Sequence, residues 1–127
     1  MMPMGSERPN MDEIRRFAAF QEEIEARSTR VQAAAAHALD RLLRKAESRD
    51  GGQARVIASF LASIYDPEVF PLDPRLMRSV DVADSDDMLV CLDAVRWGRA
   101  ELHGLLPNGE KRILNVCDVW GLQWPKE

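Results

Sequence analysis

The sequence has little of what catalytic and metal sites are usually built from. Its 127 residues include two cysteines, two histidines and one tyrosine. It has no C-x-x-C pair, no G-x-S-x-G element and no G-x-x-x-x-G-K-[ST] loop, so the common zinc, serine-nucleophile and nucleotide-binding motifs are missing. No run approaches eighteen apolar residues, so we predict no membrane-spanning helix.

The sequence also lacks the patterns of a signal peptide and of a disulfide-bonded protein. The first residues, MMPMGSERPN, lack the basic and then apolar plan of a signal peptide, so we expect a soluble cytoplasmic protein. Cys91 and Cys117 lie in apolar runs, which favours buried thiols over a disulfide in a reducing compartment. Their spacing from His37 and His103 fits no metal-ligand pattern, and we therefore predict no metal or cofactor.

What the chain does contain is an ordinary globular mixture, with 46% hydrophobic and 30% charged residues. Its length predicts one domain that can bury a core without disulfides or a metal. Residues 1–9 carry two prolines and read as a flexible leader. We divide the rest into an N-terminal helix or arm, 10–29, and a helical domain, 30–127.

The first helix poses a problem of length. Asn10 is a good N-cap, no proline or glycine follows before Gly51, and one apolar stripe recurs at spacings of three and seven: Ile14, Phe17, Ile24 and Val31. A single helix over 10–48 would span roughly 60 Å, against about 35 Å for a compact domain of this size. Either it breaks at Ser28-Thr29, which local capping chemistry favours, or its N-terminal half projects as an arm.

The remaining pattern is helical too. Residues 53–65 and 86–97 are apolar nearly all round and predict two central buried helices, and Asp73-Pro74 predicts a short helical turn through about Ser79. Residues 110–120 fit either a helix or a strand after a Pro107-Asn108-Gly109 turn, and the helix avoids placing Asp118 on an apolar face. The predicted fold class is all-α, a single compact domain of about five helices.

The order of these segments carries a resemblance. ALDRLL, GGQARVIASFL, an irregular segment, DDMLVCLDAV and a terminal helix ending in Trp resemble a small uncharacterised all-helical family of bacterial plasmids and integrative elements. The similarity covers about residues 36–124, and residues 10–30 look like an addition. The family carries no assigned activity, so the resemblance implies a fold and leaves function open.

The most chemically loaded stretch is SVDVADSDDML, with four aspartates: Asp81, Asp84, Asp86 and Asp87. Residues 66–87 hold seven acids against two arginines, a balance of −5 in a chain of net charge −4. No EF-hand register places glycine and glutamate where a calcium loop needs them. We therefore predict that Asp84 or Ser85 caps a helix, with a partner-facing acidic patch as the second interpretation.

A basic stripe on the second predicted helix, about residues 30–48, supports an alternative function, a weak DNA-binding regulator. Its members are Arg41, Arg44, Lys45 and Arg49. The following helix has one basic residue and too many apolar faces to lie in a groove, and Asp40 and Glu47 can neutralise part of the stripe. The stripe therefore also fits an ordinary solvated face.

The main prediction is a non-catalytic interaction or regulatory protein, an accessory factor of a mobile genetic element. The N-terminal stripe suits helix docking, including a homodimer, and tryptophan is enriched at binding hot spots. The predicted interaction residues are Ile14, Phe17, Ile24, Val31, Trp120 and Trp124. A third class, a small hydrolase or toxin, has no motif to support it.

Overall fold

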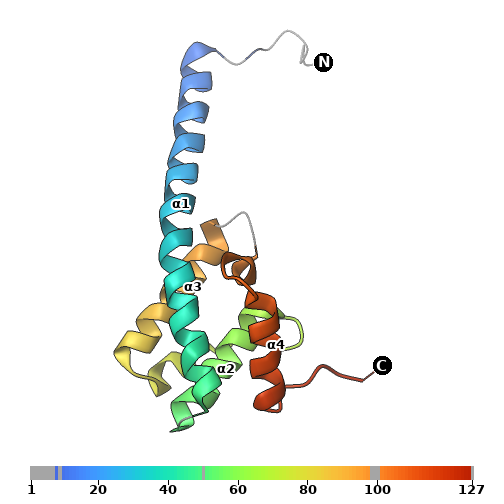
Figure 1. Ribbon diagram of the computed structural model, residues 1–127. Coiled ribbons are helices and arrows are strands. Elements are labelled where there is room, and N and C mark those ends of the chain that lie inside the picture. The colour runs from blue at the N-terminus through green and yellow to red at the C-terminus, as the bar shows by residue number, and fades with distance from the viewer. Residues whose placement is uncertain (1–7, 9, 50, 98–100, 127) are drawn as a thin grey trace.

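The computed structural model describes residues 8, 10–49, 51–97 and 101–126 (Figure 1). The predicted leader lies outside these residues apart from Arg8. Every regular element in the described ranges is helical, which confirms the all-α prediction. The elements are α1 (Met11–Ser48), α2 (Gly51–Tyr65), η2 (Pro74–Ser79), α3 (Val82–Trp97), η3 (Leu102–Leu105) and α4 (Gly109–Val119).

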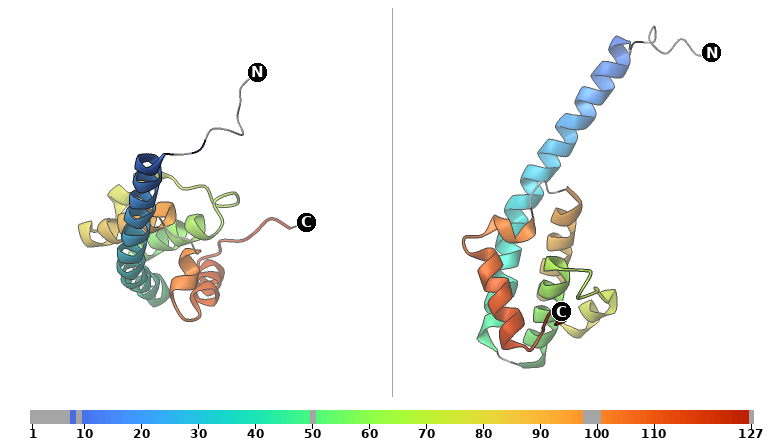
Figure 2. Two further views of the ribbon diagram at one scale, coloured as in Figure 1. Left: turned by 90° about the horizontal axis from the view of Figure 1, so that it is seen from above. Right: turned by 90° about the vertical axis from the view of Figure 1, so that its right-hand side faces the viewer.

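The first helix is continuous, so the favoured break at Ser28-Thr29 is wrong. The Asn10 side chain accepts the N–H of Glu13 at 2.8 Å and caps the helix as predicted. The Thr29 hydroxyl donates to the carbonyl of Glu25 at 2.9 Å, so it bonds back within the helix and caps nothing new. With 38 residues α1 is about 57 Å long. It fits because its N-terminal half stands clear of the other helices (Figures 1 and 2).

The helix α1 divides into two parts. We call residues 11–27 the arm and residues 28–48 the covered half. The first buried position along α1 is Ser28, and burial then recurs with helical spacing at Ala35, Ala38, Leu39, Leu42, Leu43 and Ala46. The covered half packs against α3 and α2, and α4 packs against α2 and α1. Together they form one compact core, with the arm leaving it at one end (Figure 2).

The turn into α2 uses left-handed backbone at Arg49 (φ 61°) and Gly51 (φ 77°). The predicted central position of α2 is confirmed, since Ile57, Phe60 and Leu61 are fully buried. None of the described helices is long and apolar enough to cross a membrane.

The prediction that α3 is a second fully buried helix is wrong. Met88, Cys91 and Ala94 face the core, but Leu89 and Val95 are 55% and 58% exposed. An apolar sequence all round a helix does not ensure that something packs on every side of it. The helix also starts at Val82, earlier than predicted, and Asp84 lies within it and does not cap it.

The last region is helical, as preferred over the strand. Asn108 precedes α4 in a left-handed conformation (φ 57°). Gly109 follows it and is buried. A Cβ at this position would collide with the carbonyl oxygen of His103, so the site requires glycine. The predicted turn at Asp73-Pro74 is η2, where the Asp73 carboxylate accepts the N–H of Arg75 at 3.0 Å.

Candidate functional site

The arm exposes a row of large apolar side chains. Four of them lie more than 40% open to solvent, at Met11, Ile14, Phe17 and Phe20. Phe17 is the most open, at 65%. Charged residues occupy most of the rest of the arm's surface and pair along it, as in the ion pairs Arg15–Asp12 at 3.9 Å and Arg27–Glu23 at 3.3 Å. The arm is therefore an amphipathic helix whose apolar side is uncovered.

The predicted interaction residues divide between the arm and the core. Ile14 and Phe17 are exposed, Ile24 is half-buried, and Val31 packs against the core from the covered half. Phe20 belongs to the same apolar side and was missed, because the predicted stripe steps by seven from Phe17 to Ile24 and passes over it. The wider apolar sector of a 3.6-residue helix would have included it.

The two predicted tryptophans are used inside the domain. The Trp120 indole donates to the carbonyl of Ala46 at 2.9 Å. The Trp124 indole donates to Asp66 at 2.7 Å, and its ring packs edge-on against Tyr65 and Phe70. Both indoles fasten the C-terminal segment to the domain.

The acidic cluster and the basic stripe meet each other. Asp87 accepts two hydrogen bonds from Arg41, at 2.9 and 2.8 Å, and these bonds raise the pKa of the arginine. Asp84, only 2% exposed, pairs with Lys45. Opposite charges on α1 and α3 thus join the two helices and cancel locally.

The other members of these two sets lie at the surface. The Gln53 side chain makes two hydrogen bonds with Asp81, accepting its backbone N–H at 2.8 Å and donating to its carboxylate at 3.3 Å. Asp86 is exposed. Arg44 pairs with Asp40 at 2.8 Å, as predicted, and Arg49 ends α1. Across the described ranges, no group of three or more His, Cys, Asp or Glu side chains could hold a metal ion.

Arg112 forms a junction that sequence reasoning missed. It donates to Glu47 at 2.9 and 2.8 Å and to Asp40 at 2.8 Å, tying α4 to the covered half of α1. The hydrogen bond from Arg112 is the main reason that the pKa of Asp40 is lowered. The partners are far apart in sequence, and no local pattern pointed to the pairing. Only its acidic side, Asp40 and Glu47, was expected to pair with a base.

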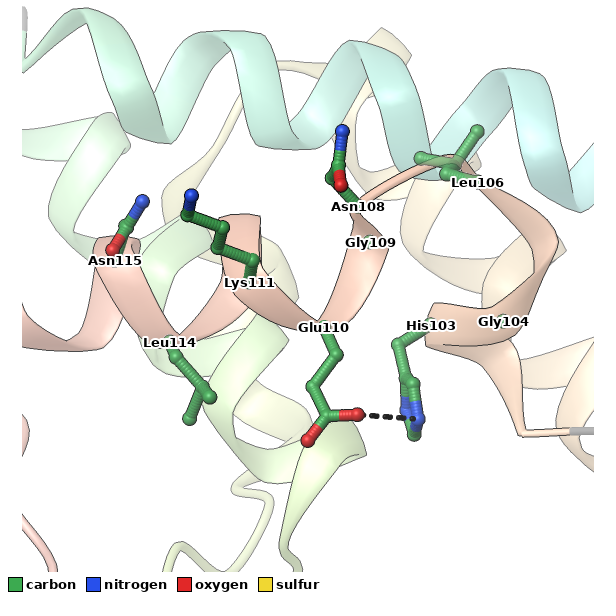
Figure 3. A pocket seen from close by; sticks show the side chains of 9 residues that line it. All are labelled: His103, Gly104, Leu106, Asn108, Gly109, Glu110, Lys111, Leu114 and Asn115. Atoms are coloured by element: carbon green, nitrogen blue, oxygen red, sulfur yellow. Dashed lines mark ion pairs between the residues drawn. The ribbon is translucent and has the colours of Figure 1, made fainter.

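A pocket of about 610 Å³ lies beside η3 and α4 (Figure 3). His103 and Glu110 point toward one another across it, with Nε2 and Oε2 3.7 Å apart. The Tyr65 hydroxyl donates to Glu110 at 2.9 Å, which raises the pKa of the phenol because its deprotonation would place two anions together. These three groups fix the start of α4 to α2 and η3. The pocket is open, and Glu110 is exposed.

The cysteines are free and buried, as expected. Burial raises the pKa of the Cys91 thiol to about 12 and raises that of Cys117 as well. At neutral pH both thiols are protonated, the form that is a poor nucleophile and a poor metal ligand.

Comparison with known proteins gives one match. The model of a family of unknown function (DUF7673) matches residues 36–121. The match runs from the covered half of α1 through α4 and leaves the arm outside. No curated protein and no solved structure matches the chain.

Proposed function

The chain belongs to this family of unknown function, DUF7673, and from that premise we propose that it is a non-catalytic interaction protein whose arm binds a helix of another protein molecule. One observation carries the proposal, the uncovered apolar side of the arm. Amphipathic helices with such faces dock against other helices or into grooves. A regular helix that ends outside its own domain is already ordered for that contact, so binding costs little conformational entropy.

The setting that we propose is the bacterial cytoplasm, with the chain as an accessory factor of a mobile genetic element. The support is the resemblance to plasmid and integrative-element proteins. DNA binding is the weaker candidate, because three of its four proposed contacts are engaged: Arg41 with Asp87, Lys45 with Asp84 and Arg44 with Asp40. A helix face whose charges cancel attracts phosphate weakly.

The test compares two double variants that each replace two exposed apolar side chains. Phe17→Glu with Phe20→Glu alters the arm, and Leu89→Glu with Val95→Glu alters the outer side of α3 by the same change. Each tagged chain is used to capture proteins from cells that contain the natural chain, and captured proteins are then titrated in purified form. We expect at least one partner to bind the α3 variant normally and the arm variant at least about tenfold more weakly, a loss of about 1.4 kcal/mol.

The proposal fails if the arm variant and the α3 variant bind the same purified partners with equal affinity. It also fails if partner binding is lost only in the α3 variant, since the interaction surface would then lie on the domain.

A further inference from the structure

The apolar side of the arm continues the side of α1 that is buried in the domain. In heptad terms Ile14, Gln21 and Ser28 occupy a positions, and Phe17, Ile24 and Val31 occupy d positions. The domain covers this seam from Ser28 onward, since Ser28 is 4% exposed and Val31 packs on the core. Arg27 lies over the Trp97 ring, 5.3 Å from its centre, at the point where α3 ends. The open part of the seam therefore runs from Ile14 to the half-buried Ile24.

We propose that a second copy of this chain covers the arm, with the two arms antiparallel. The inference rests on the proposed function and names the partner that the arm takes when the chain is alone. Its first support is steric. The domain lies on the seam side of α1, so two parallel chains would bring both domains to the same side of the paired helices at the same height. The arm is free along its length (Figure 2), so antiparallel chains place the two domains at opposite ends of the paired arms.

The second support is the register. An antiparallel coiled coil pairs a positions of one helix with d positions of the other. If Ile14 lies opposite Ile24 of the second copy, then Phe17 lies opposite Gln21, and both pairings recur by symmetry. The same register brings the two Phe20 side chains together at flanking g positions. The uncovered seam is thus used from end to end, and the exposed phenylalanines are both covered.

The third support is charge. In this register the g position Glu13 lies beside Arg27 of the second copy, and the two carry opposite charges. In the monomer Arg27 pairs with Glu23 on its own helix at 3.3 Å, with both side chains about half exposed, so that pair exchanges at little cost. A parallel pair would instead place Phe20 beside Glu25 and Glu13 beside Ala18. It would gain no opposite-charge contact.

The contact is small, because only one stretch of helix from each chain takes part. Such an area lies below that of standard stable interfaces, so we expect a reversible dimer with a Kd on the order of 10 µM.

Two measurements on the full chain test the proposal. Sedimentation equilibrium from about 1 to about 300 µM should show a monomer becoming a dimer, and Phe17→Glu should shift the midpoint at least about tenfold upward. Leu89→Glu, the control on α3, should leave the midpoint unchanged. For orientation, Ile14→Cys and Ile24→Cys chains are oxidised alone and as a mixture. In the antiparallel register residues 14 and 24 are opposite, whereas two copies of residue 14 are about 15 Å apart along the axis.

We expect a disulfide-linked dimer only in the mixture, with the wild-type chain as control for the buried native thiols. A chain that stays monomeric at all concentrations overturns self-pairing. If the binding of purified partner proteins still depends on the arm, the proposed function stands without self-pairing. Cross-linking of Ile14→Cys chains alone overturns the antiparallel orientation. A dimer that cross-links in neither experiment overturns the register.

Discussion

The arm and the covered half of α1 carry the same apolar repeat, but one is exposed and the other forms much of the core. Phe17 and Leu42 illustrate the difference, since both lie on the apolar side of one continuous helix. Phe17 is 65% exposed, while Leu42 is fully buried in the core. The repeat therefore determines which side of a helix is apolar. Whether that side is covered depends on how far the other helices reach, and α3 ends beside Arg27.

Polar contacts differ between the two halves in the same way. In the covered half, charges pair across the fold, as in Asp40–Arg112 and Lys45–Asp84. Along the arm the ion pairs join residues three or four apart on the same helix. Local pairs of this kind stabilise a helix by only tenths of a kcal/mol each. The arm should therefore gain little stability from the domain and give little to it.

The largest effect should come from truncating the same side in each half. Leu42→Ala removes a fully buried side chain and should lower the free energy of unfolding by about 3 kcal/mol. Phe17→Ala should change it by less than about 0.5 kcal/mol, because that ring has no core contact to lose. Urea unfolding at about 1 µM protein, below the proposed dimer Kd, measures both. Equal losses would show that the arm packs on the domain in solution.

A smaller effect should follow from removing the junction at Arg112. Arg112→Met leaves Asp40 and Glu47 without their shared partner, and we expect a loss of about 1–3 kcal/mol in the free energy of unfolding at pH 7. Arg15→Met, which removes an exposed ion pair in the arm, is the matched control and should cost less than about 0.5 kcal/mol. Urea unfolding of both variants checks the difference.

The Arg112 prediction also has a pH dependence. Arg112 lowers the pKa of Asp40 in the folded chain below the ordinary 3.8. A carboxyl group whose pKa is lower in the folded chain stabilises the fold at pH values above its pKa in the unfolded chain. That stabilisation is lost as the pH falls through its pKa in the folded chain. The difference in the free energy of unfolding between wild type and Arg112→Met should therefore be complete at pH 6 and become smaller below about pH 4. A gap independent of pH would mean that Arg112 acts through packing alone.

Local patterns predicted the local features of this fold. Asn10, Asp73 and Gly109 lie at helix starts. Such positions can be predicted because capping and tight turns depend on a few neighbouring residues. The error at the acidic cluster involves contacts between distant segments. The acidic cluster was interpreted as a helix cap, but Asp84 and Asp87 face Lys45 and Arg41 of α1. Residues so far apart give no signal in one sequence.

The same limit explains the candidate site. Ile14 and Phe17 were predicted as interaction residues, and their helical spacing located the apolar side. The spacing could not show that this side is uncovered, nor that Trp120 and Trp124 bond to the domain. The break predicted at Ser28-Thr29 came from assuming that the helix must fit within the domain. The position proved to be where the arm leaves the domain, although the helix continues through it.

The smallest effect should come from glycine at two exposed alanines. Ala19 in the arm and Ala33 in the covered half lie two heptads apart on the outer side of α1, so neither loses a buried contact. Ala→Gly in a helix interior costs about 1 kcal/mol. Ala33→Gly should lower the free energy of unfolding by nearly that amount, because this stretch unfolds with the core. Ala19→Gly should leave it unchanged and speed hydrogen exchange of the arm amides, because the arm opens by itself. Trp97, Trp120 and Trp124 all lie outside the arm, although Trp97 contacts its last residue, Arg27, so tryptophan fluorescence reports mainly the domain. Equal shifts from the two variants would show that α1 unfolds as one unit, and the distinction between its halves would be one of exposure and not of stability.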